Sequence, residues 1–225
     1  MDIFLAIQHT YDSIEFAVFR GQTILEQQAL SKFHASAQLI PALSAMLERH
    51  GITLSDLAFI AAHQGPGPFT TLRVVIATIN GIAFANNTPI VGVNGLEVFL
   101  REYADPLGIR TVCMLNAFNH DVYYAYFDTH HNLMMGAANG EQFLHDLAAV
   151  SGDQKFHFIG NAVTSHRTSI ETVFANRALI PALIPNTCSI DQIGLMGYAQ
   201  WQRQENVTRQ LIPHYLKTQQ FAKAH

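Results

Sequence analysis

The sequence predicts an α/β protein built from two similar lobes, each with a central sheet and covering helices. Short, wholly apolar runs such as residues 3–7 are typical of strands buried on both faces. Longer segments with apolar residues at helical spacing lie between them. The order of these segments in the first half of the chain returns, more loosely, in the second half. The chain is 49% hydrophobic and 13% charged, which is enough apolar material for a sizeable core.

The first half is expected to begin with three strands joined by short turns, which form an antiparallel meander. An amphipathic helix follows, because Leu39, Leu43 and Met46 fall at spacings of four and three. Gly51 stands just after its last turn, where glycine often ends a helix. The elements expected in this half are strands at 3–7, 14–19, 23–30, 57–62 and 89–93 and helices at 35–50, 69–85 and 96–103.

The second half is expected to repeat this order. Its elements are strands at 111–116, 122–128, 133–138 and 156–160 and helices at 140–150, 162–174 and about 192–204. We place the junction at Asp105-Pro106, so that the lobes are residues 1–105 and 106–225, with the last helix expected to pack across both. Near-duplicate lobes of this order are the plan of actin, Hsp70 and sugar kinases. The expected fold class is therefore the actin-like (ASKHA, ribonuclease H-like) α/β fold in two tandem lobes.

The composition excludes several classes of function. The net charge is -4 and Lys and Arg total 13, whereas a protein that holds nucleic acid unaided should be basic. Cys113 and Cys188 form no disulfide or metal motif. The sequence holds no His-x-x-x-His pair of the kind that grips zinc. The N-terminus lacks the features of a signal peptide, and no apolar run reaches the length of a membrane span, so we expect a cytoplasmic protein without a membrane segment.

A glycine–proline segment links a predicted buried strand to a predicted helix. Residues 64–73 read Gln-Gly-Pro-Gly-Pro-Phe-Thr-Thr-Leu-Arg. This segment resembles the signature GPGSFTGLR of the TsaB (also called YeaZ) family, from which it departs at Pro68 and Thr71. Further segments resemble the family in the same order along nearly the whole chain. They are His34-Ala35-Ser36, Pro89–Val93, Asn116-Ala117 with Val122-Tyr123, and Pro213–Leu216.

Two physical interpretations of this segment stay open. Glycine lets the backbone turn sharply, and the free N–H groups at the start of the next helix favour an anion. Gly65, Gly67 and Thr70 are therefore candidates for binding a nucleotide or another anion. The segment is equally compatible with a stiff strand-to-helix turn, since it has no lysine where a P-loop requires one.

The helix expected at 69–85 is apolar on nearly all sides, so it must be covered on all sides. The sheet covers one side, and either the same lobe or a second protein covers the other. The resemblance favours a second protein, because the family uses this helix and the one before it to dimerise or to bind a sister subunit. The candidate interface residues are Leu39, Leu43, Met46, Phe69, Leu72, Arg73, Val75, Ile76, Ile79 and Phe84. A charge introduced by Val75→Glu or Ile79→Glu is then expected to abolish pairing and leave the fold intact.

Two carboxylates of the actin-like kinases and ATPases are missing. The acid that ends the first strand, and helps hold the metal–nucleotide complex, is replaced by Gln8, and the acid of the second lobe by Asn116. Hard cations such as Mg²⁺ prefer carboxylate oxygen, so we expect no ATP hydrolysis. Next to Gln8, His9 is either a hydrogen-bond donor to a ligand or a half-exposed turn histidine.

The resemblance implies a non-catalytic subunit in the biosynthesis of N6-threonylcarbamoyladenosine (t6A) in tRNA. Such a subunit binds and supports a TsaD-type catalytic sister subunit, with a TsaE-type ATPase as a further candidate partner. It forms a homodimer when alone and meets tRNA only indirectly. Adenine nucleotide, bound at the subunit interface, is the one candidate cofactor. One alternative hypothesis is a small-molecule kinase or ATPase of the same superfold. Another is a homodimer with a separate interaction role, in which the same apolar helix forms a two-fold contact.

Overall fold

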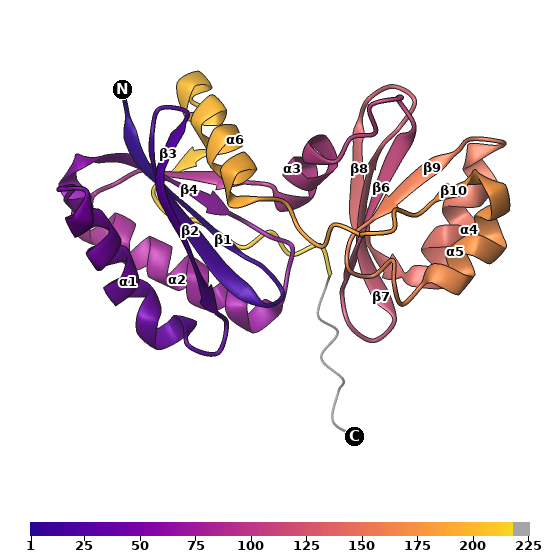
Figure 1. The fold of residues 1–225 in the computed structure, drawn as a ribbon, viewed down its shortest axis with the longest axis horizontal. Coiled ribbons are helices and arrows are strands. Elements are labelled where there is room, and N and C mark those ends of the chain that lie inside the picture. The colour runs from indigo at the N-terminus through magenta and orange to yellow at the C-terminus, as the bar shows by residue number, and fades with distance from the viewer. Residues whose placement is uncertain (218–225) are drawn as a thin grey trace. The chain divides into compact units, whose positions relative to one another are not determined.

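The computed structural model describes residues 1–217 of the chain, which divide into two compact units (Figure 1). The first unit consists of Met1–Glu102 together with Cys188–His214. The second consists of Tyr103–Thr187 and the segment that begins at Tyr215. The sequence-based division at residue 105 had assigned all later residues to the second lobe. The segment 188–214 belongs instead to the first unit, because its helix packs on the first sheet.

The first unit is built on a six-stranded sheet in the order β11-β5-β4-β1-β2-β3. Its strands are β1 (Ile3–His9), β2 (Ser13–Arg20), β3 (Thr23–Ser31), β4 (Leu57–His63), β5 (Ile90–Val93) and β11 (Val207–Thr208). β1, β2 and β3 pair antiparallel, as the expected meander requires, whereas β4 runs parallel to both β1 and β5. The short strand β11, which sequence reasoning missed, adds an antiparallel edge next to β5.

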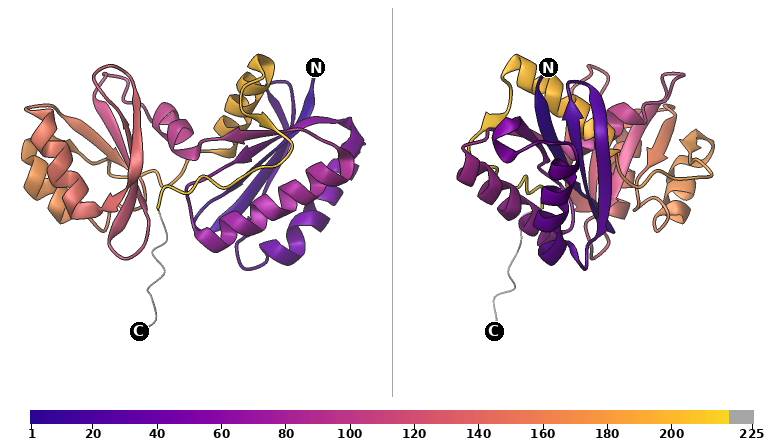
Figure 2. Two further views of the ribbon diagram at one scale, coloured as in Figure 1. Left: turned by 180° about the vertical axis from the view of Figure 1, so that it is seen from behind. Right: turned by 60° about the vertical axis from the view of Figure 1, so that its left-hand side comes forward.

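Helices cover both faces of this sheet (Figures 1 and 2). They are α1 (Ala35–Arg49), α2 (Phe69–Asn86), α3 (Gly95–Glu102) and α6 (Ile190–Arg203), with a single 3-10 turn, η1 (Leu54–Asp56). α1 packs on β2 and β3, and α2 packs on β1 and β4. α6 crosses the opposite face, where it contacts β1, β2, β4 and β5. The alternation of side chains along β1 therefore supplies two apolar layers.

Close packing of α6 explains why a distant segment returns to the first sheet. The ring of Phe4 stacks on that of Tyr198 at a centroid distance of 5.7 Å, and Phe59 stacks on Trp201 at 4.9 Å. Gly194 lies directly against the ring of Phe19, where a Cβ would overlap the ring. Aromatic stacking and the absence of a side chain at this contact together hold the helix on the sheet.

The second unit has a five-stranded sheet in the order β10-β9-β6-β7-β8. Its elements are β6 (Arg110–Asn116), β7 (Asp121–Phe127), β8 (Leu133–Asn139), α4 (Gly140–Ser151), β9 (Phe156–Ile159), α5 (Arg167–Phe174), η2 (Ala175–Arg177) and β10 (Ala178–Leu179). α4 and α5 pack against each other and enclose a core that contains Phe143, Phe156 and Phe174. The helix expected at 162–174 begins only at Arg167, because the residues before it form turns.

Candidate functional site

The paired helices α1 and α2 place most of the predicted interface residues in the core of their own unit. These side chains are at most 4% exposed and face the sheet: Leu39, Leu43, Met46, Leu72, Val75, Ile76 and Ile79. They are therefore not accessible to a partner in this structure. The sequence assigned them to the interface because an almost uniformly apolar helix gives little indication of which side meets the sheet.

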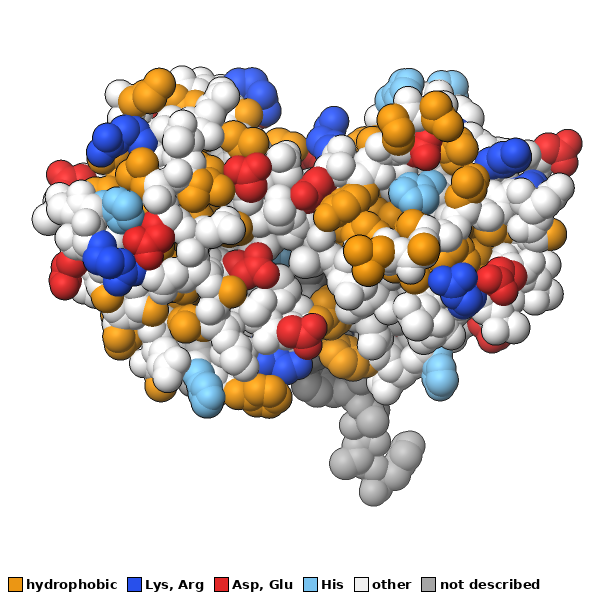
Figure 3. All heavy atoms as spheres, in the orientation of Figure 1, with side chains coloured by type: hydrophobic (Ala, Val, Ile, Leu, Met, Phe, Trp, Pro, Cys, Tyr) orange, Lys and Arg blue, Asp and Glu red, His pale blue; other side chains and the backbone are white. Residues whose placement is uncertain are grey.

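The remaining predicted interface residues lie on the outside. The ring of Phe84 is 88% exposed near the end of α2, and Phe69 is half-buried at its start. The guanidinium of Arg73 lies over the Phe69 ring, 4.1 Å from its centroid, which is the geometry of a cation–π contact. Figure 3 shows hydrophobic side chains among polar ones on the face of the first unit that it draws. The outer face of the helix pair thus keeps an apolar character.

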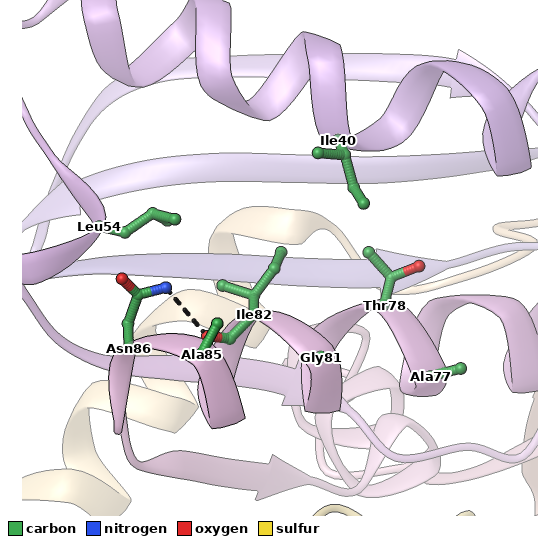
Figure 4. Close-up of a pocket in the computed structure, with 8 residues that line it drawn as sticks. All are labelled: Ile40, Leu54, Ala77, Thr78, Gly81, Ile82, Ala85 and Asn86. Atoms are coloured by element: carbon green, nitrogen blue, oxygen red, sulfur yellow. Dashed lines mark hydrogen bonds between the residues drawn. The ribbon is translucent and has the colours of Figure 1, made fainter.

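A shallow hollow of about 470 Å³ lies between α1 and α2 on this outer side (Figure 4). Its lining is mostly small or aliphatic: Ile40, Leu54, Ala77, Thr78, Gly81, Ile82, Ala85 and Asn86. Ala77, Gly81 and Ala85 recur every fourth residue and therefore form one exposed stripe along the helix. A stripe of small residues lets the backbone of another helix approach closely. The four-residue spacing of these small residues is the signal in the sequence that could have identified this face.

The two polar side chains of the hollow are already bonded to their own helix. The hydroxyl of Thr78 donates to the carbonyl of Val74 at 2.9 Å, and the Asn86 amide donates to the carbonyl of Ile82 at 3.1 Å. The hollow therefore presents mainly methyl and methylene groups outward. Among the described residues, α2 is also the one helix whose length and composition would allow a membrane span. Its inner side chains are nevertheless packed on β1 and β4, as in a core helix.

The glycine–proline turn before α2 is held by close packing. Gly65 has a φ of +114°, and a Cβ there would lie 3.2 Å from the carbonyl oxygen of His214. Gly67 lies against the imidazole of His9, where a Cβ would overlap the ring. Both glycines are buried, whereas Thr70 is exposed in the first turn of α2. These contacts give the glycines a packing role, and anion binding by Gly65, Gly67 and Thr70 stays a prediction.

A pair of buried histidines lies beneath this turn. His9 is 1% exposed and His63 is 5% exposed, so the expectation of a half-exposed His9 is wrong. Their Nδ1 atoms are 3.1 Å apart, and one ring must donate its proton to the other. Burial lowers the pKa of His63 to about 4 and that of His9 well below its ordinary value, with the neighbouring His63 as a second cause for His9. Both imidazoles are therefore neutral at pH 7.

Gln8 is fully buried at the end of β1 and acts as a hydrogen-bonding residue. Its amide nitrogen donates to a Glu15 carboxylate oxygen at 2.6 Å and to the carbonyl of Cys188 at 3.1 Å. In the second unit, the Asn116 side-chain oxygen accepts a hydrogen bond from the backbone N–H of Phe118 at 2.8 Å. Over residues 1–217, no group of three or more His, Cys, Asp or Glu side chains is arranged to hold a metal ion.

Comparison with known proteins places this chain in a family. The family model described as "TsaD: tRNA N6-adenosine threonylcarbamoyltransferase" matches residues 23–224. The chain belongs to the TsaD family. The chain is also similar to the TsaB protein of Buchnera aphidicola subsp. Schizaphis graminum, with 29% identity over 45% of this chain and 48% of that protein's length. The chain thus spans about half the length of that relative.

Two longer matches cover nearly the whole chain. The TsaB protein of Bacillus subtilis is 22% identical over 95% of this chain and 93% of its own length. The solved structure of YeaZ from Pseudomonas aeruginosa superposes with a TM-score of 0.72 at 24% identity, over 96% of this chain and all of that chain. The resemblance to TsaB (YeaZ) proteins and the actin-like α/β fold expected from the sequence are therefore confirmed.

Proposed function

We propose that this TsaD-family chain is a non-catalytic subunit in t6A biosynthesis, which pairs with a TsaD-type catalytic subunit through the outer face of α1 and α2. The observation that carries the proposal is the apolar hollow between these helices, in a chain whose relatives are named for this pathway. The net charge of -4 supports contact with tRNA through the partner rather than through this chain alone. We further propose that the pairing takes place in the cytoplasm.

The helix pair suits a helical partner because of its shape and chemistry. Ile40 is 60% exposed on α1, and Phe84 is 88% exposed on α2. On α2, the stripe of Ala77, Gly81 and Ala85 consists of small side chains. Partner helices packed in this hollow would bury both exposed apolar side chains and approach the α2 backbone closely. Burial of apolar area and a well-packed centre are the usual sources of affinity at such interfaces.

The non-catalytic part of the proposal rests on neutral side chains at two positions. Gln8 and Asn116 stand where the actin-like kinases and ATPases carry acids, and both use their amides in local hydrogen bonds. An amide oxygen is a poorer Mg²⁺ ligand than a carboxylate. The buried His9 and His63 next to Gln8 add no carboxylate oxygen, which is the ligand that Mg²⁺ prefers.

The first experiment is to deplete the protein in its own host and to quantify t6A in bulk tRNA by nucleoside mass spectrometry. A clear fall, restored by the wild-type chain, supports the proposal, and an unchanged level overturns its pathway assignment. The interface is tested by complementation with Ala77→Glu, which places a charge in the hollow. Ala149→Glu, at an exposed alanine of α4, is the matched control. The proposed interface is supported if Ala77→Glu does not restore t6A whereas Ala149→Glu does. Ala77→Glu should then also abolish binding to the TsaD-type subunit in light scattering.

The proposed homodimer and the proposed binding of nucleotide are tested separately. A homodimer would use the same face, so Ala77→Glu should also convert a dimer of the isolated chain to a monomer. A TsaE-type ATPase and adenine nucleotide are proposed to join only once the heterodimer has formed, so the isolated chain should bind nucleotide weakly in calorimetry. Magnesium-dependent ATP turnover by the purified chain would favour the small-molecule kinase instead.

A further inference from the structure

The turn between β6 and β7 has an unusual backbone. Phe118, Asn119 and His120 are consecutive and have φ values of +60°, +55° and +64°. Residues other than glycine seldom adopt this left-handed region, and a run of them persists only where the surroundings hold it. The turn leads from Asn116 at the end of β6 to Asp121 at the start of β7.

Hydrogen bonds within the second unit account for part of this restraint. The Ala117 N–H donates to the Asp121 carbonyl at 2.9 Å, and the Asp121 N–H donates to the Phe118 carbonyl at 3.1 Å. The Gly140 N–H donates to the His120 carbonyl at 2.9 Å. None of these bonds uses the carbonyl oxygen of Ala117 or the side chain of Asp121. Both groups are acceptors, so the turn presents a small electronegative site.

The ammonium group of Lys217 occupies that site. Its Nζ lies 2.7 Å from Asp121 Oδ2, 3.0 Å from the Ala117 carbonyl oxygen and 3.4 Å from the Phe118 carbonyl oxygen. An ammonium carries three donors, which matches three oxygens on one side of a turn. The side chains of Lys217 and Asp121 are 30% and 28% exposed, so solvent screens this pair less than it screens a fully exposed one.

We propose that the turn at residues 117–121 is a cation-binding cradle for a primary ammonium group, and that Lys217 is its built-in ligand. An isolated surface ion pair contributes little to stability. Here the ammonium also binds two main-chain carbonyls whose directions depend on the left-handed backbone. Its occupancy therefore stabilises the strained turn and latches the C-terminal segment onto the second unit.

The latch matters for the last crossing of the chain between the two units. Up to His214 the segment belongs to the first unit, where Asn80 of α2 forms two hydrogen bonds with the backbone of Leu211 and Gln64 binds the carbonyl of Ile212. From Tyr215 the segment belongs to the second unit, where Lys217 is its charged anchor. Loss of the ammonium would remove this anchor from the second unit and leave the anchorage on α2 intact.

Chemical rescue in the full chain tests the proposal. Lys217→Ala should increase the amide hydrogen-exchange rates of Ala117 and Asp121 about five- to tenfold, which lies within the range expected when one hydrogen bond of ordinary net strength is lost. n-Butylammonium chloride should restore slow exchange, because it supplies the missing ammonium and alkyl stem. Tetramethylammonium chloride at the same ionic strength should not, because it has no N–H donor.

The control is Lys155→Ala, which removes an exposed lysine from the same unit. It should leave exchange in the turn unchanged. The proposal is overturned if Lys217→Ala exchanges within twofold of the wild type, if Lys155→Ala has the same effect, or if the two ammonium salts act alike. Thermal unfolding of each variant, measured by circular dichroism, separates a local effect on the turn from a general loss of stability.

Discussion

The imidazole of His9 stacks on the imidazole of His63, with ring centroids 4.4 Å apart and an angle of 24° between the planes. The two residues are distant in sequence and lie on the neighbouring parallel strands β1 and β4. Their stack fills the space beneath Gly67 at the turn before α2, and beneath Gly95 at the start of α3. This contact connects the first strand to the segments that begin two helices, and it leads directly to two predictions.

Acidification should unfold the first unit through this histidine pair. The pKa of His63 is lowered from 6.5 to about 4 in the folded state by burial, so the unfolded state binds a proton first. Stability is therefore fully present above about pH 6.5 and falls as the pH drops towards 4. Between pH 7 and pH 5, His63 alone should reduce the free energy of unfolding by roughly 2 kcal/mol. Urea unfolding at the two pH values measures this loss.

A histidine on the surface provides the control for that pH dependence. His145→Gln, at an exposed position of α4, should leave the difference between pH 7 and pH 5 unchanged. The NMR titration of the His63 ring gives an independent measurement, because its resonances should not move until the pH is well below 6. A His63 titration midpoint near 6.5 in the folded protein would contradict the prediction.

Gly67→Ala should destabilise the protein, because the added methyl group would overlap the His9 ring. Overpacking of a closed site typically costs about 1–3 kcal/mol. The loss should appear as a lower urea midpoint with an unchanged m-value. His9→Ala should relieve the overlap, so the double variant should lose less stability than the sum of the two single changes. Additive losses would show that the contact between Gly67 and His9 is not the cause.

Gly81→Ala, unlike Gly67→Ala, should stabilise the protein. It should also weaken binding of the TsaD-type subunit. A Cβ at Gly81 meets no atom within 4 Å, and alanine is favoured over glycine inside a helix by about 1 kcal/mol. The isolated chain should therefore gain roughly 0.5–1 kcal/mol in its free energy of unfolding. The same methyl group would hold a partner helix away from α2, so binding of the TsaD-type subunit should weaken in titration calorimetry. Gly81→Ala with unchanged affinity would exclude close helix contact at this point.

A charge on the inner side of α2 should unfold the unit, whereas a charge on the outer side should not. Val75 is 0% exposed, so Val75→Glu would bury an unpaired carboxylate and cost at least about 3 kcal/mol. Ala77 is exposed two residues later, and Ala77→Glu should keep the wild-type thermal midpoint within a few degrees. The expectation from the sequence that Val75→Glu leaves the fold intact is thus replaced by its opposite. Circular dichroism melts of both variants decide between them.

Most of the fold could be predicted from the sequence because the elements are long and their periodicity is clear. β1 and β4 begin with continuous apolar runs at residues 3–7 and 57–62, and α1 has its apolar residues at spacings of three and four. The short strands β10 and β11 could not be predicted, since two residues carry no periodic signal and depend on a neighbouring strand for hydrogen bonds. The start of α5 at Arg167 was missed because the turns before it contain residues that are also compatible with a helix.

The sequence by itself determined the α/β class, the glycine–proline turn, the loss of carboxylates at Gln8 and Asn116, and the family that these motifs resemble. Only the tertiary structure decided which side of α2 is covered, because an apolar helix carries no directional signal until the sheet occupies one side. It also brought His9 against His63 and Lys217 against Asp121. His9 meets His63 because their strands pair, and Lys217 meets Asp121 because the end of the described chain packs against the second unit. Local sequence patterns do not encode either contact.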